Sequence, residues 1–388
     1  MKHRLLILGT LGEFVQLVKK SKERGHYTIV CDGYPDGPAR QYADASYVIP
    51  VTDIDAVAEL CQKEKVDGII TSFSDLLMEC MVKIAEKAGL PCYLKPEQLC
   101  WYRDKSACRE LLSKLGLPTP GFVKVPAAEQ NEYKLAEITA GLKYPLISKP
   151  LDKYGSRGIF IMMTWVSDGA VRVISIADRE KTQFAEGELP ESTRNVYPSC
   201  LIDKVEEPAV SLLQSYIEYT GQKEGPLSMQ FFWKAGEGIQ VCEIAARFFG
   251  YEHELTDMVY RFNMEELLLN YVYDNEYVTK MLEAQDIRKP LMHGAVLYFH
   301  GRLKQIQEQQ AAYELAEDKA VVKPWIFYEA GEEVVAYGPN PYLALYYIEA
   351  GSREELDEIS RDFFEKMSMT DPDGEEIVFQ NKIPKYSL

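Results

Sequence analysis

The chain has 388 residues, of which 46% are hydrophobic and 27% charged, so it is long enough for two or three globular domains. Its formal net charge of −17 argues against a sequence-independent nucleic-acid binder, which needs a basic surface to displace counterions from phosphates. No apolar run approaches the ~20 residues of a membrane span. Neither a nucleic acid nor a membrane is therefore expected as a partner.

The eight cysteines are scattered along the chain and form no CxxC pair, so the sequence indicates neither a zinc site nor a redox motif. Most of them have apolar neighbours, as buried thiols do. The N-terminal apolar run in MKHRLLILGT is too short for a signal peptide. We therefore expect a cytoplasmic protein.

Residues 1–100 alternate between short apolar runs and amphipathic helix patterns. The runs RLLILGT, YTIVCDG, ASYVIP and DGIITS predict strands, and helices are predicted over 13–24, 53–64 and 76–88. This alternation predicts a Rossmann-like α/β domain with a parallel sheet, whose ligands lie beyond the carboxyl ends of the strands. Residues 9–10, 32–33 and 72–75 lie at those ends.

The sequence GTLG after the first predicted strand is only part of a dinucleotide-binding fingerprint, because no complete GxGxxG follows. We interpret it as a tight turn from a strand into a helix. The pattern GxxxxGK[ST] is also missing from the sequence, which excludes a Walker-type nucleotide site.

The remaining residues predict mixed α+β structure. Helices are expected from Asp104 to a stop at Gly116, over 207–220 and over 264–282, and KYPLISKP predicts a strand. GPLSMQFFW and GIQVCEIAAR predict a hairpin joined by KAGEG. From about His293 onward, apolar strand patterns and a helix over 353–367 predict a small α+β C-terminal domain.

Basic residues and glycines occur in an order that suits a bound triphosphate. Lys105 opens a predicted helix, and Lys149 ends a predicted strand. Each lysine can offer a point charge to phosphate groups. The loop after Lys149 contains two glycines that let successive backbone N–H groups turn toward an anion, and two further donor side chains; its residues are Gly155, Ser156, Arg157 and Gly158.

Gln230 and Glu243 lie on the two arms of the predicted hairpin, and Arg247 follows Glu243 by four residues. A glutamate within an apolar strand is costly to bury without a cation or hydrogen bonds. Mg²⁺ keeps several waters and bridges phosphates, so it needs few protein ligands. Arg247 can stabilise the charge that develops during phosphoryl transfer. Alone, a strand-ending lysine is typical of a solvated side chain and GSRG of a plain turn, whereas Glu243 is the strongest single residue because a glutamate within an apolar strand needs a partner. Together these features indicate a nucleotide site.

The sequences RDKSACRELLSKLGLPTP, YPLISKP…GSRGI and GPLSMQFFWKAGEGIQVCEIAAR, in this order, resemble the ATP-grasp superfamily. The resemblance is to its carboxylate–amine ligases and to the carbamoyl phosphate synthase large subunit, and it covers essentially the whole chain. It implies a Rossmann-like domain over 1–100, an ATP-grasp domain over 101–290 and a small α+β domain over 291–388. The implied enzyme is a ligase in which ATP converts a carboxylate to an acyl phosphate and an amine attacks it, forming a C–N bond.

The resemblance also implies roles for residues. Lys105, Lys149, Gly155, Ser156, Arg157 and Gly158 match positions that bind ATP. Gln230 and Glu243 match ligands of Mg²⁺, and Glu243 and Arg247 match catalytic positions. Ala245 stands where the family often has an asparagine ligand, so one Mg²⁺ ligand is missing from the pattern.

A second departure concerns the hinge and lid that cover the adenine in the family, an element of roughly 40 residues. The segment FIMMTWVSDGAVRVISIADREK resembles the strands beyond that hinge, although it follows the phosphate loop directly. We predict that the hinge and lid are missing between Ile159 and Phe160. They are either omitted from the sequence or truly absent, and we favour omission.

Two other functions remain open: a bicarbonate-using enzyme that forms carbamoyl phosphate or carboxyphosphate, and a non-catalytic nucleotide-binding protein with the same fold. The expected substrates are a small-molecule carboxylate and an amine, bound between residues 72–75 and Arg247. Glu252, His253 and Glu254 are candidates for amine recognition, although a histidine among acids is more typical of the surface. A homodimer is the default expectation for such a chain.

Overall fold

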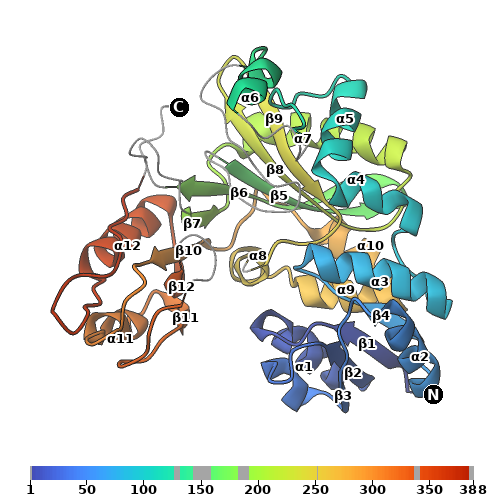
Figure 1. The fold of residues 1–388 in the computed structure, drawn as a ribbon, viewed down its shortest axis with the longest axis horizontal. Coiled ribbons are helices and arrows are strands. Elements are labelled where there is room, and N and C mark those ends of the chain that lie inside the picture. The colour runs from blue at the N-terminus through green and yellow to red at the C-terminus, as the bar shows by residue number, and fades with distance from the viewer. Residues whose placement is uncertain are drawn as a thin grey trace.

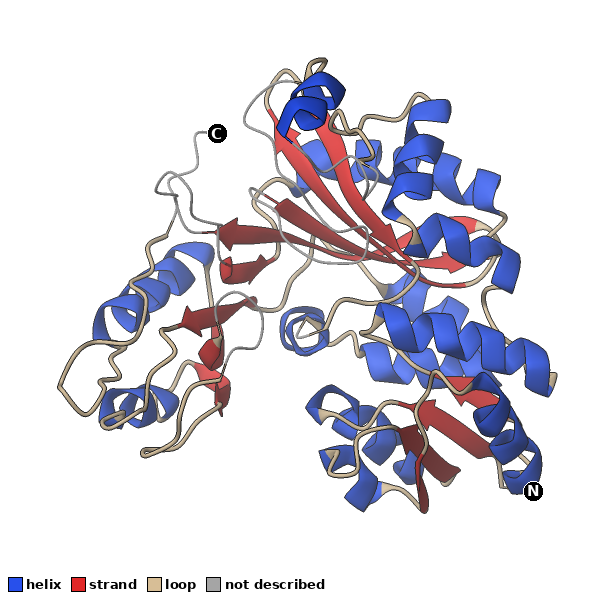
Figure 2. Cartoon of the chain, viewed as in Figure 1, coloured by secondary structure: helices blue, strands red, loops and turns tan. Residues whose placement is uncertain are grey.

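The protein contains two β-sheets with helices packed around them, as the computed structural model shows (Figures 1 and 2). The structure describes residues 2–125, 132–142, 159–181, 192–250, 252–335 and 341–383. Within these ranges, none of the helices is long and apolar enough to span a membrane.

The first sheet is four-stranded and parallel, in the order β3-β2-β1-β4, and confirms the Rossmann-like prediction. Its strands are β1 (Arg4–Leu8), β2 (Tyr27–Asp32), β3 (Ala45–Val48) and β4 (Gly68–Ile70). The helices of this region are α1 (Val15–Glu23), α2 (Ile54–Glu64) and α3 (Asp75–Ala88). Asp53 and Ser74 start α2 and α3, because each side chain accepts a hydrogen bond from a backbone N–H of the first turn.

The second sheet is eight-stranded and antiparallel, in the order β11-β12-β10-β7-β6-β5-β8-β9. Its first five strands in chain order are β5 (Ile159–Ser167), β6 (Ala170–Lys181), β7 (Ser192–Tyr197), β8 (Gly225–Lys234) and β9 (Gly238–Ala245). The last three are β10 (His293–His300), β11 (Val321–Ile326) and β12 (Tyr342–Ala350). The predicted hairpin is β8–β9. The C-terminal strands extend the sheet of the central region through the β7–β10 pair, so the two regions share one sheet.

Helices cover this sheet and join it to the first one (Figure 1). Those between the two sheets in sequence are α4 (Leu99–Arg103), α5 (Lys105–Lys114) and α6 (Glu132–Thr139). The later ones are α7 (Ile202–Thr220), α8 (His253–Tyr260), α9 (Met264–Tyr273), α10 (Asn275–Ala284), α11 (Gln310–Ala316) and α12 (Arg353–Lys366). The helix predicted over 264–282 is two helices, because the Asp274 side chain caps a new helix start.

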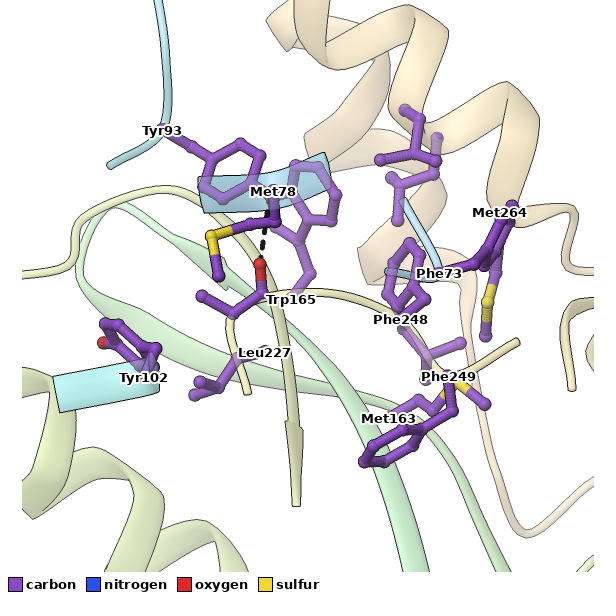
Figure 3. Packing of buried hydrophobic residues seen from close by; sticks show 14 of the residues in the cluster. Phe73, Met78, Tyr93, Tyr102, Met163, Trp165, Leu227, Phe248, Phe249 and Met264 are labelled. Carbon is purple, nitrogen blue, oxygen red and sulfur yellow. Dashed lines mark hydrogen bonds between the residues drawn. The ribbon is translucent and has the colours of Figure 1, made fainter. Parts of the chain in front are cut away.

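The first sheet and the β5–β9 region share one hydrophobic core, while a second core lies between α12 and the C-terminal strands. Figure 3 shows part of the shared core, where Phe73 from the β4–α3 turn, Trp165 from β5 and Phe248 from the segment after β9 contribute aromatic rings. Aromatic side chains bury large areas, so this packing fixes the carboxyl end of the parallel sheet beside β9.

The prediction that a hinge and lid are missing between Ile159 and Phe160 by omission is wrong. Strand β5 runs through both residues and keeps an unbroken register there with β6 and with β8. A strand paired on both sides leaves no point at which a further segment could leave and re-enter the sheet.

Candidate functional site

A small pocket lies between the start of α5 and strand β9. Its lining comes from residues 102–105, from Cys108 and Arg109 one turn further along α5, from residues 242–244 of β9, and from Asp75. Asp104 fixes the start of α5, since its Oδ1 accepts hydrogen bonds from the backbone N–H groups of Ser106 (2.7 Å) and Ala107 (3.2 Å). The structure thus brings the predicted residues Lys105 and Glu243 to one pocket.

Gln230 and Glu243 are direct cross-strand partners in the β8–β9 pair, so their side chains share one face of the sheet. Ala245 pairs with Ser228 on the same face, and the Ser228 hydroxyl donates to the carbonyl of Arg247 at 2.5 Å. Ser228 therefore does not take the place of the missing asparagine. In the described part of the chain, no group of three or more His, Cys, Asp or Glu side chains is arranged to hold a metal ion.

This donor set fits Mg²⁺ only as an ion that bridges phosphates. One carboxylate and one amide oxygen are too few for a site built from protein alone, but Mg²⁺ is commonly held by one or two carboxylates together with phosphate oxygens and water. The Glu243 carboxylate makes no hydrogen bond or ion pair within the described residues, so its charge is available for such an ion.

Arg247 lies beside this pocket in a buried ion pair with Asp75. Its Nε and Nη2 donate to the two carboxylate oxygens of Asp75 at 2.6 and 2.7 Å, and Nη1 donates to the carbonyl of Phe248 at 3.1 Å. Both residues are less than one-tenth exposed. Burial alone would raise the pKa of Asp75, but the Arg247 guanidinium outweighs it and holds that pKa below its usual value. The pair joins the β4–α3 turn to the end of β9, where the substrate was expected.

A second set of buried charges surrounds His253 at the start of α8. His253 is 3% exposed, which contradicts the surface position that the sequence favoured. Its Nε2 lies 3.1 Å from Glu254 Oε2 and 3.3 Å from Glu265 Oε1, and its ring stacks on Phe73 with centroids 4.6 Å apart. Desolvation on its own lowers the pKa of His253, but the carboxylates of Glu254 and Glu265 together have the larger, opposite effect. The pKa of His253 is therefore raised to about 9.

Two of the predicted amine-recognition candidates are occupied by protein partners. The Glu254 carboxylate also contacts Lys323 Nζ at 2.5 Å, and despite burial, His253 and Lys323 lower its pKa to about 2. Glu252 accepts hydrogen bonds from the Asn195 amide and from the Tyr197 hydroxyl, the latter at 2.6 Å. These contacts join α8 to β7 and β11.

Complete burial raises the pKa of Glu252 to about 7 from the model-peptide value of 4.5. Since the native state prefers protonated Glu252, this group stabilises the fold at acidic pH and loses that contribution as pH rises toward 7. We expect the free energy of unfolding of Glu252→Gln, relative to the unmodified protein, to rise as pH increases from 4.5 to 7 and to stay level above it. Urea unfolding over this pH range measures the difference in the free energy of unfolding between the two proteins. A difference that does not change with pH would show that Glu252 is ionised in the native state over the whole range.

Several predicted residues lie outside the part that the structure describes: Lys149, Gly155, Ser156, Arg157 and Gly158. Among the described ones, Lys105, Gln230, Glu243 and Arg247 come from four separate segments that meet around β9.

Sequence reasoning missed Arg103 and Arg109, which also line the pocket. Arg109 was detectable, because it follows Lys105 by four residues and so shares its helix face. Its guanidinium donates to Thr119 Oγ1 at 2.9 Å and to the carbonyl of Cys242 at 3.4 Å, and therefore ties the loop after α5 to β9 beside Glu243. The pairing of Asp75 with Arg247 had no local signal.

Comparisons with known proteins agree with this architecture. A family model described as "PylC-like, N-terminal domain" matches residues 5–90. The formate-dependent phosphoribosylglycinamide formyltransferases of Synechococcus sp. (strain CC9902) and Bacillus velezensis are 29% and 30% identical over 161 and 156 residues. These matches cover 41% and 40% of this chain and 39% of each relative, so the chain matches about two-fifths of the length of these relatives.

Solved structures match over nearly the whole chain. The L-amino acid ligase from Bacillus licheniformis superposes with a TM-score of 0.78 at 18% identity, covering 95% of this chain and 99% of that one. The phosphoribosylglycinamide synthetase from Anaerococcus prevotii superposes with a TM-score of 0.68 at 16% identity, and the match covers 96% of this chain and 100% of that one. The N5-carboxyaminoimidazole ribonucleotide synthetase from Thermotoga maritima superposes with a TM-score of 0.66 at 16% identity, and the match also covers 96% of this chain and 100% of that one. The resemblance to the ATP-grasp fold is confirmed.

Proposed function

We propose that this chain is an ATP-dependent ligase that converts a substrate carboxylate to an acyl phosphate, which an amine then attacks to form an amide or peptide bond. The observation that carries the proposal is the pocket in which Lys105 and Glu243 meet beside the Arg247–Asp75 pair. A cation, a carboxylate without a partner among the described residues, and an arginine around one space suit phosphoryl transfer, where positioning and electrostatics supply most of the catalysis. The names of the matched formyltransferases and of the L-amino acid ligase also support it.

The proposed roles follow the sequence prediction. Lys105 and Lys149, with the loop of Gly155, Ser156, Arg157 and Gly158, bind the phosphates of ATP. Glu243 and Gln230 hold Mg²⁺, which when bound neutralises charge on the phosphate oxygens. Arg247 orients the substrate carboxylate and stabilises charge on the transferred phosphoryl group.

The wider expectations also remain proposals. We propose the domain division 1–100, 101–290 and 291–388, with small-molecule substrates and a homodimer as the assembly. The eight cysteines form no disulfide, which supports a reducing, cytoplasmic location.

One assay tests the proposal against its alternatives. The protein is incubated with Mg-ATP and separate pools of L-amino acids, other organic acids with amines, and bicarbonate, while phosphate release is measured. Release stimulated by a carboxylate and an amine together supports the ligase, and release stimulated by bicarbonate supports the carboxyphosphate-forming alternative. Tight ATP binding without release from any pool would contradict both enzymes and favour a non-catalytic protein, the reading that Ala245 supports.

Replacing Lys105 by alanine should raise the KM for ATP at least about tenfold, because a charge-assisted hydrogen bond of about 1.5–3 kcal/mol is lost. The matched control is Lys114→Ala, which removes an exposed lysine from the other end of the same helix and should leave the KM unchanged. Equal KM values in the two variants would exclude Lys105 from the nucleotide site.

A further inference from the structure

The GTLGEF turn after β1 places a carboxylate against the segment that follows Arg247. Glu13 lies in the short 3₁₀ helix Gly12–Phe14 and is partly buried. It packs against Gly250, where a Cβ atom would come within 2.7 Å of Glu13 Oε2. The glycine therefore allows the carboxyl group to reach the segment that follows Arg247.

This turn is not free to hold a dinucleotide. The ring of Phe14 fills the space above Gly9, since a Cβ atom there would lie 2.5 Å from it. The Thr10 backbone N–H and hydroxyl donate to Asp32 Oδ2 at 2.9 and 3.0 Å, and a Cβ atom on Gly37 would lie 2.0 Å from Thr10 Oγ1. Side chains thus occupy the surface that a pyrophosphate would approach.

Glu13 differs from the other acids around His253 because it has no close partner in the described residues. Glu252 is held by Asn195 and Tyr197, Glu254 by His253 and Lys323, and Glu265 by His253. The Glu13 carboxylate makes no hydrogen bond or ion pair with any described residue.

The surroundings keep this carboxylate easy to protonate. Burial raises the pKa of Glu13, and the charges that face it partly offset one another: His253 and Arg247 lower the pKa, whereas Glu254 raises it. The effect of Arg247 on this pKa agrees with the contact of Glu13 with Gly250, three residues beyond Arg247, which is the residue proposed to orient the reacting carboxylate.

Two buried polar atoms nearby also lack partners. Ser72 is fully buried just beyond the end of β4. Among the described residues, neither its hydroxyl nor His253 Nδ1 has a hydrogen-bond partner. Ser72 directly precedes Phe73 in the chain, and the ring of His253 stacks on the ring of Phe73. Buried polar groups are nearly always satisfied, so these two atoms require a partner that the described residues do not supply, such as a water molecule or a polar ligand.

We propose that Glu13 binds the ammonium group of the attacking amine and accepts its proton. This inference rests on the proposed ligase function. An ammonium nitrogen has no lone pair, so one proton must pass to Glu13 before attack. The neutral amine then forms the C–N bond, the acyl C–O bond breaks, and phosphate leaves with that electron pair and takes the second amine proton. Glu13 afterwards returns its proton to water.

Hydroxylamine separates this role from the rest of the reaction, because it is largely neutral near pH 7 and traps acyl phosphates as hydroxamates without losing a proton first. The full-length protein, Glu13→Gln and the control Glu23→Gln, an exposed residue of α1, are assayed with Mg-ATP and L-amino acids, with and without hydroxylamine. We expect Glu13→Gln to lose about a hundredfold in amide formation, as when a general base is removed, but to keep hydroxamate formation within about twofold. Raising the pH should restore part of its amide formation, because the amine then loses its proton to solvent.

An equal loss of amide and hydroxamate formation, or no loss of either, would overturn the role of Glu13 while leaving the ligase function intact. No hydroxamate from the unmodified protein with any carboxylate pool would instead overturn the ligase function itself. Thermal unfolding checks that Glu13→Gln folds. Its Tm should be unchanged or higher, because the variant removes a partly buried carboxylate that has no partner among the described residues. Glu13→Asp keeps the carboxylate but moves it back by one methylene. This variant should lose less amide formation than Glu13→Gln does, and it should keep hydroxamate formation.

Discussion

Glu243→Gln is expected to reduce ATP-dependent phosphate release by about a hundred- to a thousandfold, the effect of removing one preorganised electrostatic contact. The pocket contains two other carboxylates, but Asp75 is paired with Arg247 and Asp104 caps α5. Glu243 therefore supplies the charge that can hold a phosphate-bridging cation, and a neutral amide of the same shape cannot replace it.

Steady-state phosphate release with the most active substrate pool measures the effect. The control is Glu237→Gln, which neutralises an exposed glutamate in the β8–β9 turn and should keep full activity. Chemical unfolding should place Glu243→Gln within about 0.5 kcal/mol of the unmodified protein. A variant that retains activity, or one that loses several kcal/mol of stability, would indicate a structural glutamate rather than a metal ligand.

Asp75→Ala is expected to lower the free energy of unfolding by about 3–5 kcal/mol, because it leaves the Arg247 guanidinium buried without its carboxylate. Arg247 is only 4% exposed and cannot reach solvent without disturbing the packing around Phe248. Removing both charges with Asp75→Ala combined with Arg247→Leu should recover part of this loss. Urea unfolding of the single and double variants measures the coupling.

The pH dependence of Asp75→Ala gives an independent check. The native pKa of Asp75 is lowered, so its stabilising contribution is complete above the unfolded value of 3.8 and disappears as pH falls through the lower native value. The difference in the free energy of unfolding between Asp75→Ala and the unmodified protein should therefore be constant near neutral pH and become smaller in strong acid. Asp55→Ala, at an exposed pair with Lys87, is the control and should cost at most about 1 kcal/mol.

Much of the fold was predictable because local patterns determine it. Period-two and fully apolar runs located β1, β2 and β4, and the KAGEG turn located the β8–β9 hairpin. That hairpin register alone sets Gln230 opposite Glu243, so the predicted metal-binding pair required only secondary structure.

The missed features depend on contacts between distant segments. Asp75 and Arg247 are 172 residues apart, and nothing near either residue indicates the other. His253 was expected at the surface because its neighbours are acidic, but Glu254 and Glu265 turn inward and allow a charged imidazole to be buried. Glu13 was overlooked because its turn resembled an incomplete phosphate-binding fingerprint.

The β7–β10 pair has a consequence for how this chain can be divided. Its four residue pairs, from Gly294 with Tyr197 to Leu297 with Arg194, are the seam between the central and C-terminal regions. A polypeptide shortened to end before β10 would leave β7 as an open edge, with unpaired backbone N–H and C=O groups ready to bind another strand. It would also lose α12, whose Arg353 pairs with the buried Asp178 and Glu180 of β6. The C-terminal quarter thus supplies one end of the eight-stranded sheet, and its removal is a route to aggregation.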